Sequence, residues 1–292
     1  MGDVLAGFHA AWEFESDSVL IRYERGIRTP KLFQALGERR VPLEAIEGVT
    51  LTPGRRGTVV LRVEPRAGAD PLIEAAAGQL KESGDPYRLV LPAERETLAE
   101  YYADELRPLL TGSGRTERYL VAPPEAPLQF KAYDGKASFD GKAVSFRWSW
   151  TGASSAKWKA GDQSFPVADL GGVEWRSPEM FEGYLRLLPR DADASAAAAA
   201  APAVPQADQD PAAVVFGLGY GPVHESLPFA AAVLAAVRER GASAPVPVSV
   251  PAPRRDPADI AERIRHLGEL HQAGLVTDEE FSSKKAELLA EL

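Results

Sequence analysis

Apolar and polar residues alternate along many short segments of the first 240 residues, which is the pattern of half-buried β-strands. The clearest segment is "KASFDGKAVSFRW" (136–148), where the alternation runs on both sides of Asp140-Gly141. Asp-Gly between two alternating runs favours a tight hairpin, because both turn positions need positive φ. The runs "VVLRVE" (59–64) and "YLRLL" (184–188) are rich in β-forming residues. The pattern predicts a chain built mainly of strands.

Two longer segments have apolar residues at helical spacing. In "PAERETLAEYYADELRPLL" (92–110), Leu98, Tyr102 and Leu106 recur every fourth residue. The Ala-rich segment "ESLPFAAAVLAAVRER" (225–240) has a similar apolar stripe. Each segment follows a group of predicted strands, so each group is expected to end in one helix.

The chain also repeats itself at a nearly constant interval. "VPLEAIEGVTL" (41–51) aligns with "FPVADLGGVEW" (165–175) at an interval of 124 residues, and "SVLIRY" (18–23) aligns with "AVSFRW" (143–148) at 125. Because the interval is constant within one residue, the sequence predicts two copies of one domain. Each copy is expected to contain about six or seven short strands and one C-terminal helix.

The repeat and the composition divide the chain into four segments. We expect a first domain over 1–112, a second over 113–242, a Pro-rich linker over 243–255 and a helical hairpin over 256–292. Within the second domain, the Ala- and Pro-rich residues 190–209 include few large apolar side chains, so we expect a disordered surface insertion there.

The charge balance argues against nucleic acid as a partner. The chain has a net charge of −9. Its segments 1–112, 113–242 and 243–292 carry 14 basic against 18 acidic side chains, 13 against 15, and 6 against 9. No segment is basic, whereas binding to a phosphate backbone depends on clustered positive charge.

Residue types that support catalysis or metal binding are sparse. The chain has no Cys, which removes disulfides, thiolate metal sites and cysteine nucleophiles. His266 and His271 are five residues apart, which does not place both on one helix face for zinc. "GLGYG" (217–221) looks like a phosphate-binding loop, but no Gly-Lys-Ser/Thr follows, so a strand-to-helix turn is the better interpretation. We therefore expect no metal, no cofactor and no enzymatic activity, and the sequence identifies no small-molecule substrate.

The repeat resembles a two-copy bacterial family of unknown function, of actinobacterial type, whose copies look like pleckstrin-homology-type barrels. The residues that carry the resemblance include "FDGKAVSF" (139–146), "VPLEAIEGV" (41–49), "FPVADLGGV" (165–173) and "GYLRLL" (183–188). The resemblance implies a mainly β fold with α, in which two tandem barrels each have a C-terminal helix. It brings no known activity with it.

The tail resembles the short C-terminal domain called SHOCT, through "IAERIRHLGELHQAGLVTDEEFSSKKAELL" (260–289). Such domains are thought to mediate assembly or partner binding. Thr277 and Glu280 form a capping box, and Gly274 suits the left-handed position that ends a helix. A hairpin of this size usually needs a partner to stay folded. The apolar residues expected to meet that partner are Ile260, Ile264, Leu267, Leu270, Leu275, Phe281 and Leu288.

A basic cluster near the first predicted hairpin gives an alternative. Its residues are Arg22, Arg28, Lys31, Arg39 and Arg40, and similar clusters of pleckstrin-homology domains bind anionic head groups. The other interpretation, which we favour, is a solvated strand edge protected by charge from edge pairing.

The sequence as a whole favours a non-enzymatic cytoplasmic scaffold or adaptor. Protein partners would bind the two pleckstrin-homology-like domains, and the C-terminal hairpin would recruit a partner or self-associate. Any surface residue among Trp148, Trp150 and Trp158 would suit a protein contact. The alternative is a peripheral protein of anionic lipid surfaces that uses the basic cluster.

Overall fold

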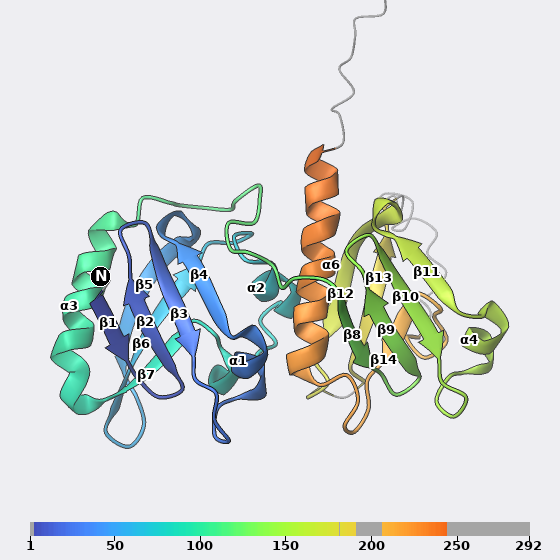
Figure 1. Cartoon of the computed structure of the whole chain (residues 1–292), viewed down its shortest axis with the longest axis horizontal. Coiled ribbons are helices and arrows are strands. Elements are labelled where there is room, and N and C mark those ends of the chain that lie inside the picture. Colours follow the sequence, from blue (N-terminus) through green and yellow to red (C-terminus); the bar gives the residue numbers. More distant parts are fainter. Residues whose placement is uncertain (1–2, 181, 191–205, 244–292) are drawn as a thin grey trace, which may run out of the picture. The chain divides into compact units, whose positions relative to one another are not determined.

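The two repeats contain equivalent strands in the same order, followed in each by one helix, in a computed structural model that describes residues 3–180, 182–190 and 206–243 (Figure 1). Equivalent strands of the two repeats are offset by 125 residues, as at Ser18–Tyr23 and Ala143–Trp148. The predicted repeat is confirmed.

The first repeat consists of two antiparallel sheets and a helix. The four-stranded sheet has the order β1-β2-β3-β4, and the three-stranded sheet has the order β5-β6-β7. The strands are β1 (Asp3–Ala6), β2 (Ala10–Phe14), β3 (Ser18–Tyr23), β4 (Glu38–Pro42), β5 (Ile46–Pro53), β6 (Thr58–Pro65) and β7 (Arg88–Pro92). The helices are α1 (Lys31–Leu36), α2 (Pro71–Ala76) and α3 (Glu96–Leu106).

The second repeat has the same two sheets, in the orders β11-β10-β9-β8 and β12-β13-β14. Its strands are β8 (Leu128–Lys131), β9 (Gly135–Phe139), β10 (Ala143–Trp148), β11 (Gln163–Pro166), β12 (Leu170–Arg176), β13 (Tyr184–Pro189) and β14 (Ala213–Val215). Its helices are α4 (Ser155–Ala160) and α6 (Val223–Ser243).

The expected hairpin at Asp140-Gly141 joins β9 to β10. Gly141 has a φ of 92°, and the Asp140 carboxylate accepts hydrogen bonds from the amides of Lys142 and Ala143. The alternation on either side of the turn then places Phe139, Val144 and Phe146 in the core.

The expectation of closed barrels is wrong for the part of the chain that the structure describes. The chain leaves β4 at Pro42 and passes through a short 3₁₀ turn into β5, which pairs only with β6. The two sheets of the first repeat meet at a corner, where the Phe8 amide donates to the Val90 carbonyl at 2.7 Å. The equivalent bond in the second repeat joins Tyr133 to Val215 at 2.9 Å. Each repeat is therefore an α+β unit of two sheets that do not close on each other.

The two C-terminal helices differ in how much of their surface is buried. In α3, Leu106 is buried while Leu98 and Tyr101 are exposed, as expected for an amphipathic surface helix. In α6, the residues from Leu227 to Val233 are all buried. The Ala-rich helix α6 packs on β8 and β12 with one side and on α1 and α2 of the first repeat with another (Figure 1).

Contacts between the repeats follow from this position of α6. Leu32 of α1 and Leu72 of α2 are buried in the same apolar cluster as Phe229 of α6. The Arg238 guanidinium pairs with Glu74 at 2.7 Å and lies 3.8 Å from the centre of the Tyr119 ring. The second repeat therefore completes its core with side chains of the first.

Several predicted segments lie outside the described residues: 191–205 of the insertion, the linker from 244 and the hairpin 256–292, with Ile260, Ile264, Leu267, Leu270, Leu275, Phe281 and Leu288. The last residues of the predicted insertion are described. The Ala207 carbonyl accepts a hydrogen bond from Lys157, and the Asp208 carbonyl accepts one from Ser154. Among the described helices, none is long and apolar enough to cross a membrane.

Candidate functional site

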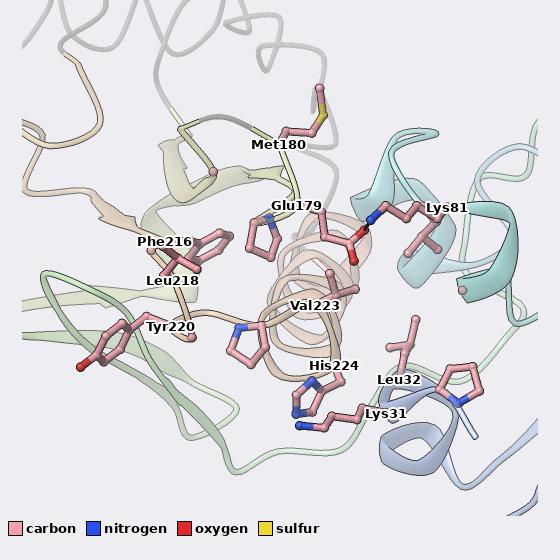
Figure 2. A pocket seen from close by; sticks show the side chains of 18 of the residues that line it. Lys31, Leu32, Lys81, Glu179, Met180, Phe216, Leu218, Tyr220, Val223 and His224 are labelled. Atoms are coloured by element: carbon pink, nitrogen blue, oxygen red, sulfur yellow. Dashed lines mark ion pairs between the residues drawn. The ribbon is translucent and has the colours of Figure 1, made fainter. Parts of the chain in front are cut away.

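A pocket of about 800 Å³ lies where the two repeats meet (Figure 2). We call it the inter-repeat pocket. Its walls come from the start of α1, the segment after α2, the β12–β13 connection and the turn that leads into α6. Leu32, Leu80, Phe216, Leu218 and Val223 supply much of its apolar surface.

Charged side chains gather at two places in the inter-repeat pocket. Lys81 pairs with Glu179 at 3.1 Å. Lys31 and His224 lie together, away from that pair (Figure 2). Burial lowers the pKa of the His224 imidazole, the positive charge of Lys31 lowers it further, and Glu225 opposes the shift. His224 is therefore mostly neutral near pH 7, and Lys31 is the positive group at this place.

Exposed apolar residues lie on α4 and on loops of the second repeat, and two of them, Leu218 and Tyr220, also line the pocket. The rings of Trp150 and Trp158 lie 5.4 Å apart, and those of Tyr133 and Tyr220 lie 6.2 Å apart. Trp150 is 84% exposed and Leu218 is fully exposed. We call these five residues the aromatic surface. Because burial of such side chains is favourable, a surface of this kind is typical of a binding site.

A buried ion pair holds the loops that carry the aromatic surface. Lys157 of α4 pairs with Asp134 of the β8–β9 turn and donates to the Ala213 carbonyl at 2.8 Å. The Asp134 carboxylate accepts from the Val215 amide, and its backbone carbonyl accepts from the Ser149 amide. One ion pair thus connects four segments of the second repeat.

Burial works against both charges of this pair. It raises the pKa of the Asp134 carboxyl and lowers the pKa of the Lys157 ammonium, and the attraction between the two groups opposes both shifts. Lys157 also lies 4.9 Å from the centre of the Trp148 ring, which favours its charged form.

The first repeat has no such ion pair at the equivalent positions, which are Phe33 and His9. There, the ring of Phe33 stacks on that of Tyr23 at 4.8 Å. Tyr23 corresponds to Trp148, so a stacked aromatic pair in one repeat is replaced by a cation on an aromatic ring in the other. Comparison of the two copies is the sequence signal that could have revealed the pair. Read alone, Lys157 in "KWK" looks like a solvated charge.

The structure does not bring the predicted basic cluster together. Arg39 is buried and pairs with Asp70 at 2.7 Å. Arg22 pairs with Glu13 at 2.6 Å, and Arg40 pairs with Glu15. Arg28 is exposed, and Lys31 lines the inter-repeat pocket.

Sequence reasoning missed part of the aromatic surface. Trp150 and Trp158 were singled out, but Leu218 and Tyr220 were read only as parts of a strand-to-helix turn. Tyr133 gave no signal, because its neighbours on the surface are distant in the sequence.

Comparison with protein families agrees with the repeated fold. The model of a domain of unknown function, DUF4429, matches the chain twice, at residues 12–107 and 137–234. The chain belongs to the DUF4429 family. In this DUF4429 protein the short C-terminal domain (SHOCT) also matches, at residues 262–289. No curated protein matches the chain.

Proposed function

We propose that this DUF4429 protein is a non-enzymatic cytoplasmic adaptor. It binds a protein partner through the aromatic surface of its second repeat, and its SHOCT domain recruits a further partner or self-associates. The observation that carries the proposal is the exposure of Trp150 and Leu218 on neighbouring loops of one repeat.

The chemistry of the aromatic surface supports a protein partner. Trp and Tyr are enriched among the residues that dominate the binding energy of protein interfaces, because they bury a large area and lose little rotamer entropy. The Lys157–Asp134 pair beneath the loops fixes their backbone before binding, which reduces the entropy lost on association.

The arrangement of the strands supports a pleckstrin-homology-like nature for each repeat. Each has a four-stranded sheet, then a three-stranded sheet, then one helix. Such a domain serves as a scaffold that presents loops, in keeping with the position of the aromatic surface.

A comparative pull-down tests the adaptor proposal. The full chain, its Trp150→Ala variant and its Tyr101→Ala variant are used as baits, and captured proteins are quantified by mass spectrometry. Tyr101 is also an exposed aromatic residue, but it lies on α3 of the first repeat.

Loss of a hot-spot Trp typically costs about 2 kcal/mol or more, roughly 30-fold in affinity. We expect a defined set of partners to be lost with Trp150→Ala and kept with Tyr101→Ala. The proposal fails if the two variants capture the same proteins as the parent.

A second candidate is binding to an anionic lipid surface. It is favoured by Ile27, which is fully exposed on the loop between β3 and α1 and stands next to Arg28. An apolar residue flanked by a cation suits the interface of an anionic membrane. Sedimentation with phosphatidylglycerol vesicles separates the candidates, since salt-sensitive binding that is lost in Ile27→Asp and Arg28→Gln variants supports the lipid function.

A further inference from the structure

We propose that the inter-repeat pocket binds a small amphipathic acid, with the apolar body of the ligand inside the pocket and its carboxylate at Lys31 and His224. The proposal does not rest on the adaptor role: Leu218 and Tyr220 belong to both the pocket and the aromatic surface, but Lys31 and His224, which would bind the carboxylate, do not belong to the aromatic surface.

The size and lining of the inter-repeat pocket suit a small apolar ligand. Small-molecule sites typically have volumes of about 300–1,000 Å³ and apolar walls with few polar groups. This pocket has a volume of about 800 Å³. Leu32 and Phe216 are almost fully buried and form firm walls, while Val223 and Leu80 are partly exposed and can lose further solvent contact. Burial of an apolar ligand against these side chains is favourable in proportion to the area removed from water.

The distribution of charge selects an anion and places its head group. Lys81 is already neutralised by Glu179. Lys31 has no ion pair among the described residues, and its ammonium group lies beside the His224 ring (Figure 2). The carboxylates of the lining, Glu179 and Glu182, both belong to the β12–β13 connection. Glu225 does not line the pocket, but its carboxylate lies 3.7 Å from Nε2 of His224. Among the described lining residues, Lys31 is therefore the cation that an apolar ligand with one negative charge would meet.

His224 makes the bound carboxylate detectable. The groups that face its imidazole are Lys31 from α1 and Glu225 from its own helix, and the pocket beyond them contains Lys81, Glu179 and Tyr220. A carboxylate placed between Lys31 and His224 favours the imidazolium, because an opposite charge within a few ångströms stabilises the charged form. Binding should thus raise the pKa of His224.

The test uses decanoate below its micelle concentration, with decanol and decyltrimethylammonium as probes that have the same chain but no charge or the opposite charge. Calorimetry measures the affinity of each probe for the full chain, and NMR follows the titration of His224. We expect decanoate to bind more tightly than the other two probes and to raise the pKa of His224.

Three variants assign the binding to the pocket. Lys31→Gln should weaken decanoate binding by about tenfold, as removal of one charged partner does, and should leave decanol unaffected. Lys31→Arg should retain most of the affinity. Lys136→Gln changes the net charge equally at an exposed residue of β9 that does not line the pocket, and should have no effect. Lys31 is itself exposed, so its replacement leaves the fold intact, as a melting curve will verify.

Three outcomes overturn the proposal. They are no binding of decanoate, equal affinity for decanoate and decanol, and equal loss with Lys31→Gln and Lys136→Gln. A failure of this proposal is distinguishable from a failure of the adaptor role, because the Trp150→Ala pull-down changes a residue that does not line the pocket.

Discussion

At the residue scale, the first repeat depends on a buried charge network. Arg39 of β4 and the phenol of Tyr87 both bind the carboxylate of Asp70, at 2.7 Å and 2.6 Å. The same carboxylate accepts from the Leu72 amide and so caps α2. A buried charge is tolerated only when its partners satisfy it, and loss of one partner leaves the other charge in an apolar environment.

Asp70→Asn is therefore expected to destabilise the protein by about 3–5 kcal/mol, because the Arg39 charge stays buried without its counter-ion. Urea unfolding measures the loss. The matched control is Glu15→Gln, which removes the partner of Arg40 at the surface and should cost about 1 kcal/mol or less. If both variants lose the same free energy, the network does not stabilise the first repeat.

Two buried phenols in the same core predict a loss of stability at alkaline pH. Burial raises the pKa of Tyr23 and of Tyr87 above the ordinary value near 10. The folded state then keeps protons that the unfolded state releases, so this stabilisation is complete below about pH 10 and is lost as the pH rises further. Each tyrosine contributes a slope of about 1.4 kcal/mol per pH unit. Urea unfolding between pH 9 and 11 should show a shallower slope for Tyr23→Phe than for the parent. Equal slopes would exclude this explanation.

At the element scale, the Lys157–Asp134 pair decides how the loops of the second repeat are held. Lys157→Met should destabilise by about 3–5 kcal/mol, because Asp134 stays buried and unpaired. The double variant Lys157→Phe, Asp134→His copies the first repeat and should recover part of that loss, since a well-packed apolar replacement of a buried ion pair is often tolerated. Urea unfolding of Lys157→Phe, of Asp134→His and of the double variant gives the coupling between the two sites.

Recovery should be incomplete, because the Ala207 and Ala213 carbonyls lose the donor that Lys157 supplies. A double variant less stable than Lys157→Met would show that the two repeats hold their loops by different means.

The sequence predicts an element well where the interactions that form it are local in the chain. The place of the hairpin at Asp140-Gly141 was predicted correctly, because a tight turn depends on its own residues, although Gly141 has positive φ and Asp140 does not. The separation of the two sheets was not predicted, since it depends on whether β4 and β5 pair across the turn after Pro42. The inter-repeat pocket was also missed, because Lys31 and His224 come from different repeats.

At the scale of the whole molecule, the two repeats are not interchangeable. Helix α6 packs into the core of its own repeat and also packs on α2 of the first repeat, whereas α3 has one exposed face. The Ala-rich composition of α6 reflects burial on more than one side. The two buried apolar clusters of the described residues lie between Leu5 and Val237. Both repeats belong to one compact unit, Met1–Ser243.

Removal of residues 244–292 should leave the melting temperature nearly unchanged, because the two repeats belong to a compact unit, Met1–Ser243, that does not include this segment. The proposed role of the SHOCT domain in recruitment predicts a different result for assembly. Light scattering should show a lower mass for the truncated chain, or a pull-down should show lost partners.

Leu267→Glu and Phe281→Glu in the full chain should act like the truncation, since each places a charge in the predicted apolar seam. Glu269→Gln, a charge change at a residue outside the predicted seam, is the control and should change neither mass nor partners. A truncated chain that melts much lower would show that the tail stabilises the repeats. A truncated chain with the same mass and the same partners would refute recruitment, because avidity requires the tethered module to bind something.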